Sequence, residues 1–162
     1  MAICEMSKYL ISDTREKKNQ HVLSYFDKVG IRYEIAKLDY GDYQDVYRPQ
    51  ISIDRKQNIA ELAKNVTVEA QRFKREIERA QNANSTLVIL VEQNRYKDRD
   101  RWIHVEDISD LMLWSGKHTS IRGEKIFRVL YNWTRVYPLR VEFCDKRQTG
   151  KRILEIIYGR YE

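Results

Sequence analysis

Short apolar runs alternate with amphipathic stretches along the chain, a pattern that predicts strands alternating with helices. The first apolar run covers residues 9–12 and ends at Asp13. A helix is then predicted over 15–29, with one apolar stripe formed by Val22, Phe26 and Val29. Gly30 is placed to end this helix, because glycine is favoured just after a helix C-terminus.

The same alternation continues to the end of the chain. Further strands are predicted over 31–38, 50–55, 86–91 and 139–144, with a turn or strand start at 40–43. Further helices are predicted over 57–65, 69–82, 107–114, 123–137 and 149–158, and the charged stretch 95–101 is expected to be an exposed loop. The run 86–91 is apolar throughout, as in a strand covered on both faces. The predicted fold class is α/β, a mixed β-sheet flanked by helices.

Composition favours one globular domain over 1–162. The hydrophobic fraction is 42%, and only 2 Pro and 6 Gly leave little material for linkers. The N-terminal residues carry Glu5 and Lys8 and are expected to be neither a signal peptide nor a membrane anchor. Cys4 and Cys144 lack metal-ligand spacing and are interpreted as reduced thiols, which favours a cytoplasmic protein, nucleoid-associated or nuclear in a eukaryote.

The chain is basic, with a net charge of +6 and a pI near 9.3. This balance favours a polyanionic partner such as DNA, and no membrane partner is expected. Several carboxylates nevertheless fall near basic strand ends, which a purely electrostatic binder would not need. A nuclease needs both, since Arg and Lys hold phosphates while carboxylates hold a cation.

Candidate chemistry centres on Asp42, Asp54 and Lys56. The two aspartates lie at the ends of two predicted strands that can be neighbours, so they can converge on one ion. Lys56 is two residues beyond Asp54 and therefore points to the same face, toward an attacking water. Mg²⁺, with Mn²⁺ as a substitute, takes such oxygen ligands and supplies hydroxide for phosphodiester hydrolysis.

Each of these residues also has a simpler interpretation. Asp42 after Gly41 fits a turn, and Asp54 with Lys56 fits an exposed strand face. Asp13 fits a helix cap, with Glu16 completing a capping box.

The order and wording of three motifs resemble the nuclease domain of the XPF family of structure-specific endonucleases. These motifs are Ser12-Asp13-Thr14-Arg15-Glu16, Gly41-Asp42-Tyr43 and Ile53-Asp54-Arg55-Lys56. Domains of that family carry D-x-R-E, G-D-(Y/F) and V-E-R-K-x-x-x-D in this order on the restriction-endonuclease-like PD-(D/E)XK fold. The resemblance covers about residues 9–92, and the remainder is interpreted as a C-terminal α/β completion.

The resemblance implies a role for each matched residue. Asp42, Asp54, Asp13 and the Arg55 backbone carbonyl would bind the metal, and Asp13 and Glu16, which border the site, would belong to the catalytic set. Lys56 would orient or deprotonate the attacking water. Arg15 and Arg55 would contact the phosphate or brace the carboxylates.

The sequence departs from the family pattern in two places. Asp54 stands where the family usually has Glu. The aspartate side chain is shorter but still ligates metal. The downstream acid is displaced by one position to Glu61, so its membership of the site stays open. The family's tandem helix-hairpin-helix domain is not expected within these 162 residues.

Basic and aromatic residues outside the motifs are interpreted in two ways. Two basic clusters either contact DNA phosphates or form solvated helix faces, and both alternatives stay open. The clusters are Arg72, Lys74, Arg75 and Arg79, and Lys146, Arg147, Lys151 and Arg152. Trp102, Trp114 and Trp133 suit core packing or, for some of them, base stacking. His104 and His118 have no partner at ligand spacing and suit structural roles.

The favoured function is a Mg²⁺-dependent DNA endonuclease acting on branched, flap or junction DNA. The alternatives are a catalytically inactive DNA-binding or scaffold subunit of XPF-like type, and a DNA-processing nuclease of a phage or other mobile element. Because XPF-like nuclease domains commonly pair, a homodimer through the C-terminal helices or an XPF-like partner subunit is also expected.

Overall fold

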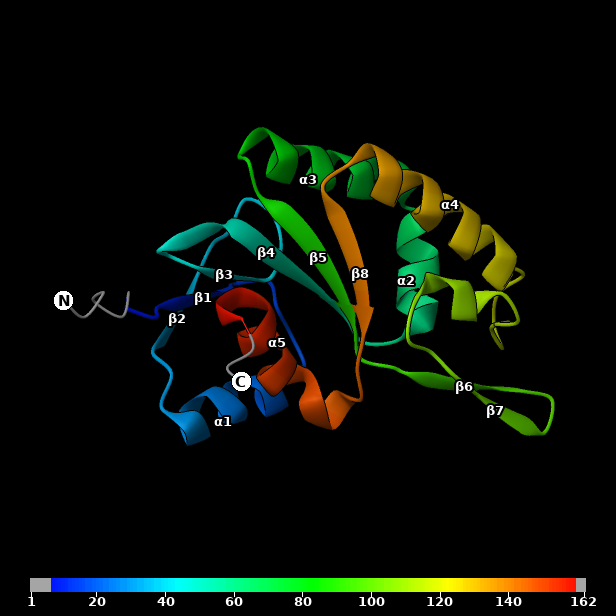
Figure 1. Ribbon diagram of the computed structural model, residues 1–162, viewed down its shortest axis with the longest axis horizontal. Helices are drawn as coiled ribbons and strands as arrows, with labels where there is room; N and C mark the ends of the chain where they lie inside the picture. The colour runs from blue at the N-terminus through cyan, green and yellow to red at the C-terminus, as the bar shows by residue number, and fades with distance from the viewer. Residues whose placement is uncertain (1–6, 160–162) are drawn as a thin grey trace.

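A six-stranded mixed sheet forms the centre of the molecule, as seen in the computed structural model, which describes residues 7–159 (Figure 1). The strand order is β2-β1-β3-β4-β5-β8. The pairs β1–β2, β4–β5 and β5–β8 are parallel, while β3 is antiparallel to both of its neighbours. The strands are β1 (Leu10–Asp13), β2 (Tyr33–Ala36), β3 (Tyr43–Asp45), β4 (Arg48–Lys56), β5 (Thr86–Val91) and β8 (Leu139–Phe143). The predicted α/β class with a mixed sheet is confirmed.

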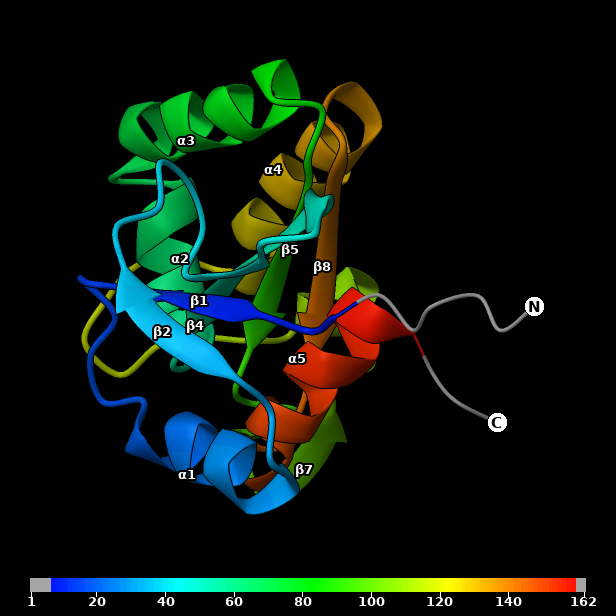
Figure 2. The ribbon, with the colours of Figure 1, turned by 90° about the vertical axis from the view of Figure 1, so that its left-hand side faces the viewer.

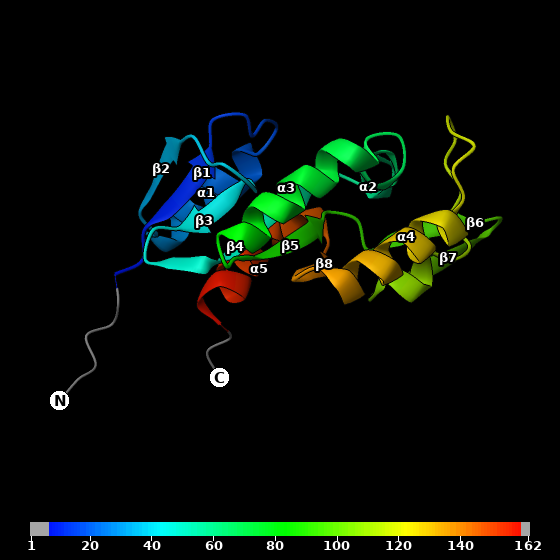
Figure 3. The same ribbon diagram turned by 90° about the horizontal axis from the view of Figure 1, so that it is seen from above.

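Helices cover both faces of this sheet and divide the core in two (Figures 2 and 3). One face carries α1 (Gln20–Val29) and α5 (Thr149–Tyr158), packed around Phe26, Tyr43 and Ile153. The other carries α2 (Ile59–Val66), α3 (Ala70–Asn82) and α4 (Gly123–Val136), packed around Phe73, Ile77 and Trp133. Within residues 7–159, no helix has the length and apolarity needed to span a bilayer.

The first helix begins five residues later than predicted, at Gln20 instead of position 15. The intervening segment is irregular, and Lys18 has a positive φ of 54°. Gly30 ends the helix in the left-handed conformation as predicted, with φ 74°. Val22 and Phe26 are buried, but the third residue of the predicted stripe, Val29, is 48% exposed.

The charged stretch 95–101 was wrongly predicted to be a loop. It belongs to a two-stranded hairpin made of β6 (Arg95–Asp98) and β7 (Arg101–His104). Alternation explains the hairpin, because Tyr96 and Ile103 pack on the core while their charged neighbours face outward. The helix predicted over 107–114 is also wrong: only the 3₁₀ turn Ile108–Leu111 forms there, and a second 3₁₀ turn covers Lys146–Gln148.

Candidate active site

A tight approach between the segment before β3 and strand β4 places Asp42 beside the end of β4. The Asp42 N–H donates to the Ile53 carbonyl at 2.6 Å. Gly41 makes this approach possible, because its φ is 71° and a Cβ there would lie 3.1 Å from the Ile53 carbonyl oxygen. Its N–H donates to Glu76 Oε1 of α3 at 2.8 Å, which fixes the segment to that helix.

Asp42 and Asp54 form an electrostatically strained pair. Asp42 Oδ2 accepts the Arg55 backbone N–H at 2.8 Å, which anchors this carboxylate to β4. Burial, followed by the negative charges of Asp54 and Glu16, raises the pKa of Asp42 well above its usual range. Burial also raises the pKa of Asp54 to about 6, although the Lys56 charge opposes this. A cation between the two carboxylates would relieve both effects.

Lys56 lies beside Asp54 on the face of β4 that α2 and α3 cover. Its Nζ is 2.8 Å from Asp54 Oδ2, donates to Asn65 Oδ1 at 2.5 Å and lies 4.6 Å from the centre of the Phe73 ring. Burial lowers the pKa of Lys56, but the charges of Asp54 and Asp42 outweigh it, so the net shift is upward. Lys56 is therefore a fixed ammonium group.

The donor set fits a hard divalent cation. The buried Asp54 Oδ2 lies 2.8 Å from Lys56 Nζ in an ion pair and accepts no other hydrogen bond among the described residues. A carboxylate with a single ion-pair partner keeps lone pairs that a metal ion can take. No group of three or more His, Cys, Asp and Glu suited to a metal ion occurs within residues 7–159. Two carboxylates suffice for Mg²⁺, which usually keeps several waters and takes further oxygens from a phosphate substrate.

Asp13 does not join this pair. Its Oδ1 accepts the Leu38 N–H at 2.7 Å, and its Oδ2 accepts the Arg15 backbone N–H at 3.1 Å and Arg15 Nε at 2.8 Å. These bonds occupy the lone pairs that a metal would need. Asp13 instead positions Arg15, whose side chain is 66% exposed and feels the charges of Glu76 and Asp42.

The predicted capping box of Asp13 and Glu16 is wrong, because the helix starts at Gln20 and neither carboxylate caps it. Glu16 instead accepts the Tyr43 hydroxyl at 2.6 Å and pairs with Arg55 Nε at 2.6 Å. It therefore borders the site from behind, holding the strand that carries Asp54.

Arg55 points to the opposite face of β4 from Asp54 and Lys56. Its side chain is 1% exposed, pairs with both Glu16 and Glu92, and donates to the Lys17 carbonyl at 2.6 Å. Of the two roles suggested by the resemblance, this arrangement is that of a brace; the guanidinium does not face outward toward DNA. Glu92 in turn accepts the Thr149 hydroxyl at 2.6 Å and contacts His21.

Sequence reasoning missed Glu76 and Glu92. Glu92 directly follows the apolar run of β5, and a charged residue at the end of a buried strand is the signal that was available. Glu76 lies within the basic stretch of α3, and its charge raises the pKa of Asp54. Glu61 accepts the Gln57 N–H at 2.9 Å in the first turn of α2, and its charge also raises the pKa of Asp54. Glu61 therefore lies close enough to the site to influence it.

The basic helices are mostly exposed and partly paired. Arg75 is exposed, while Arg72 pairs with Glu69, the N-cap residue of α3. Arg79 Nε donates to the Asp39 carbonyl at 3.0 Å. Near the C-terminus, Arg147 pairs with Asp145 and Arg152 with Glu142 and Glu155, whereas Lys146 and Lys151 are exposed.

Two of the three tryptophans, Trp114 and Trp133, are buried in the core as expected, but Trp102 is 56% exposed. Cys144 is a free buried thiol, and burial raises its pKa to about 11. Cys4 lies outside the described residues. His104 and His118 are exposed.

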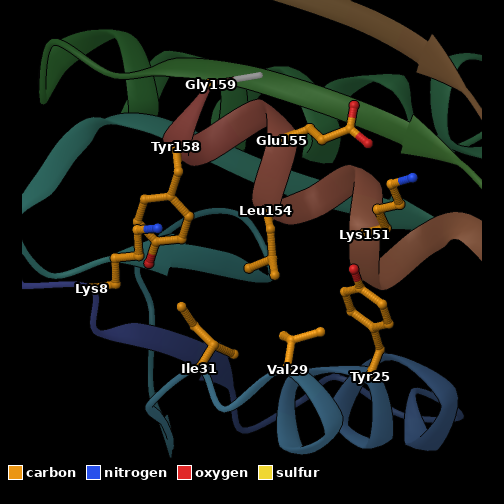
Figure 4. A pocket seen from close by; sticks show the side chains of 9 residues that line it. All are labelled: Lys8, Tyr25, Val29, Ile31, Lys151, Leu154, Glu155, Tyr158 and Gly159. Carbon is orange, nitrogen blue, oxygen red and sulfur yellow. The ribbon is translucent and has the colours of Figure 1, made fainter. Parts of the chain in front are cut away.

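A hollow of about 500 Å³ between α1 and α5 contains none of the candidate catalytic residues (Figure 4). Apolar side chains such as Val29, Ile31 and Leu154 line it, together with residues near both ends of the described chain. It lies on the helix pair that covers the Arg55 face, so it is separate from the Asp54 face.

The fold is similar to two solved structures of XPF from Aeropyrum pernix. The first is 18% identical, with a TM-score of 0.66; the match covers 93% of this chain and 60% of the XPF chain. The second, a complex with DNA, is 19% identical, with a TM-score of 0.63; the match covers 93% of this chain and 64% of the XPF chain. The chain thus spans less than two thirds of either structure. No curated protein gives a significant match.

The sequence family comparison reaches beyond the motif-bearing half. The ERCC4 domain matches residues 12–156, which includes all three motifs and continues through β8 into α5. The segment from 93 onward, which carried no specific motif by inspection, therefore belongs to the same domain match. Together with the XPF fold, this match shows that the chain belongs to the ERCC4 domain family, the XPF-type nucleases.

Proposed function

We propose that this chain is a metal-dependent DNA endonuclease that hydrolyses phosphodiester bonds in branched, flap or junction DNA. The observation that carries the proposal is the buried set of Asp42, Asp54 and Lys56, in which Asp54 Oδ2 has no partner other than Lys56 among the described residues. Membership of the ERCC4 domain family supports it independently.

Asp42 and Asp54 would hold Mg²⁺, or Mn²⁺ in its place. The Arg55 carbonyl is a candidate third ligand. In a strand, the N–H and C=O of one residue point to the same side, and the Arg55 N–H points to Asp42. The bound ion would polarise the scissile phosphate and lower the pKa of an attacking water.

Lys56 would position the attacking water as a donor. Its pKa is raised, and its Nζ is held by Asn65 and by the Phe73 ring. A fixed ammonium stabilises negative charge that develops on the water or the phosphate without reorganising. Proton removal from the water then falls to a solvent base or a phosphate oxygen.

DNA would be bound by Arg15, Arg72 and Arg75, all exposed. Arg15 interacts electrostatically with the carboxylate pair, since the charge of Asp42 raises the pKa of Arg15. The solved DNA complex of the similar XPF supports DNA as the partner. Asp13 serves this function by holding Arg15 in place.

We also propose a homodimer, or pairing with an XPF-like partner subunit, through the C-terminal helices. Tyr131 and Val136 on α4 are 45% and 68% exposed, which leaves apolar surface there for a second subunit. Light scattering at high protein concentration tests this, and a monomer throughout contradicts the homodimer.

A cleavage panel tests the proposed function. The protein is incubated with end-labelled duplex, flap, fork and four-way-junction DNA in Mg²⁺, Mn²⁺ or EDTA, and the products are resolved by length. Cleavage in either metal but not in EDTA is expected, strongest on the branched substrates. Binding without any cleavage would support the inactive subunit instead, and equal cleavage in EDTA would exclude the metal.

A further inference from the structure

A basic groove of about 810 Å³ lies beside the candidate active site, between α2, the β6–β7 hairpin and the loop 115–121. In Figure 1 the hairpin extends from the end of β5 past the foot of α2. We call this hollow the hairpin groove. It contains none of the residues assigned above to the metal or to the DNA contacts.

The register of the hairpin places one aromatic ring and two cations on the same outward face. Lys97 is directly opposite Trp102, and Arg95 follows on the same side. The Arg95 guanidinium carbon lies 4.5 Å, and Lys97 Nζ 5.2 Å, from the centre of the Trp102 ring. The opposite face of the hairpin anchors it, because Tyr96 is 5% exposed and its hydroxyl donates to the Asp110 carbonyl at 2.5 Å. Trp102 is thus held out on a braced platform while 56% of it stays exposed.

The charge of the groove is one-sided. Lys64, Arg95, Lys97 and Lys117 line it, and no Asp or Glu does so among the described residues, although Lys64 pairs with Glu69 outside the groove at 3.4 Å. A ligand of complementary charge is therefore an anion. An aromatic face beside several cations matches a nucleotide chain, in which flat bases alternate with phosphates.

The groove adjoins the catalytic end of the sheet through two elements. Asn58, which lines it, is two residues beyond Lys56, and Gln93, which also lines it, is two residues beyond the Lys56 partner Val91. Around α2, Ala60 and Lys64 face the groove, while Asn65 contacts Lys56. Successive helical residues are rotated by roughly 100°, so the groove and the catalytic lysine occupy neighbouring faces of one helix.

We propose that the hairpin groove binds an unpaired DNA strand next to the scissile bond, with a base stacked on Trp102 and its phosphates near Arg95, Lys97 and Lys64. An unpaired base can offer its whole face to an indole ring, whereas both faces of each internal base of a duplex are covered by its neighbours. The inference deepens the proposed function and rests on it for the nature of the ligand. It gives the preference for branched DNA a physical origin within this domain.

Binding in EDTA tests the groove without any cleavage. Fluorescence anisotropy measures the affinity for a labelled 12-nucleotide oligo-dT and for a blunt duplex of equal length. Trp102→Ala is expected to weaken oligo-dT binding by about 5- to 150-fold, the range for loss of one base–aromatic stack, and to leave duplex binding unchanged. Trp102→Phe is expected to recover most of the loss.

Leu113→Ala is the matched control, because Leu113 is 51% exposed and does not line the groove. Lys97→Ala, compared with Arg99→Ala at the hairpin tip, tests the phosphate contact. Only the former is expected to reduce the salt dependence of oligo-dT binding, by about 0.7 in the logarithmic slope. Thermal melts confirm that every variant is folded.

Three outcomes overturn the proposal: no oligo-dT binding by the unaltered protein, unchanged binding by Trp102→Ala, or an equal loss for duplex and oligo-dT. The proposed nuclease function fails separately. Binding to oligo-dT that depends on Trp102, without cleavage in the DNA panel, would support the groove while excluding catalysis. Metal-dependent cleavage, together with unchanged oligo-dT binding by Trp102→Ala, would support the nuclease function while excluding the groove as the strand-binding site.

Discussion

The two faces of strand β4 both bury charged residues, but the residues on one face have more ion-pair and hydrogen-bond partners than those on the other. On one face, Arg55 is paired with Glu16 and Glu92 and donates to the Lys17 carbonyl. On the other, Asp54 keeps an oxygen with no partner other than Lys56 among the described residues and has a raised pKa. The residues alternate along one strand, so a single backbone holds both arrangements.

The difference separates a brace from a reaction site. A fully paired ion cluster resists change, because removing one member leaves its partners buried and uncompensated. The pKa of Asp54 stays raised even with Lys56 beside it, so this carboxylate has free energy to gain from a further cation. In the proposed function, the motif Asp54-Arg55-Lys56 thus combines two chemically active residues with a structural one between them.

Removing the active face is expected to have the largest effect. Asp54→Ala or the isosteric Asp54→Asn, and Lys56→Ala, should each lower metal-dependent cleavage by at least about 100-fold, since they delete the proposed metal ligand and the proposed water donor. Initial rates on the preferred DNA substrate measure this. DNA binding in EDTA should persist, and Asp27→Asn, an exposed carboxylate on α1, serves as control. Full activity of both site variants in Mg²⁺ would contradict the assignment.

Breaking the brace should act on stability instead. Arg55→Met leaves Glu16 and Glu92 buried without their cation, at an expected cost of about 3–5 kcal/mol in the free energy of unfolding. Urea denaturation of this variant and of Arg128→Met, an exposed arginine on α4, measures the difference. An Arg55→Met protein as stable as the control, yet impaired in DNA binding, would show that Arg55 contacts DNA after all.

The position of Asp42 can be disturbed through the backbone. Gly41→Ala and Gly30→Ala both place a side chain at φ above 70°, but only Gly41 also approaches a neighbour, the Ile53 carbonyl. The φ strain alone should cost about 1 kcal/mol in Gly30→Ala. Gly41→Ala should cost more and should also slow cleavage, because Asp42 moves with it. Equal unfolding free energies and equal rates for the two variants would refute this placement.

The smallest expected effect is a gain in stability. The folded-state pKa of Asp54 is about 6 against an ordinary 3.8, so the metal-free fold binds more protons than the unfolded chain in that window. Its stability should therefore fall as pH rises from about 4 to 6.

Asp42→Asn removes one of the two repelling charges and keeps an oxygen for the Arg55 N–H. It should raise Tm at pH 7 in EDTA and reduce the further rise on adding Mg²⁺, both measurable by differential scanning fluorimetry. A lower Tm in EDTA would speak against the repulsion.

Elements with a strong local signal were predictable from sequence. The run 86–91 coincides with β5, and Gly30 ends α1 as expected. The hairpin was missed because its charged residues masked the alternation of Tyr96 and Ile103. The start of α1 was missed because Asp13 and Glu16 match a capping pattern, whereas tertiary partners claim both side chains.

The site shows the same division. Asp42, Asp54 and Lys56 could be grouped from their order along the chain, because motif spacing and strand alternation place them. The partners Glu76 and Glu92 could not, since each arrives from an element distant in sequence. Trp102 could be separated from the core tryptophans only once the register of the hairpin was known.

The aromatic support of Lys56 bears on how far this domain can be divided. Phe73, beneath the ammonium group, is itself stacked on Trp133 of α4, with ring centres 6.2 Å apart and planes inclined by 16°. A fragment ending soon after residue 92 would keep every motif yet lose the ring on which that support rests. The motif-bearing half is therefore not a transplantable catalytic module, and grafting it into another scaffold requires an equivalent of Trp133.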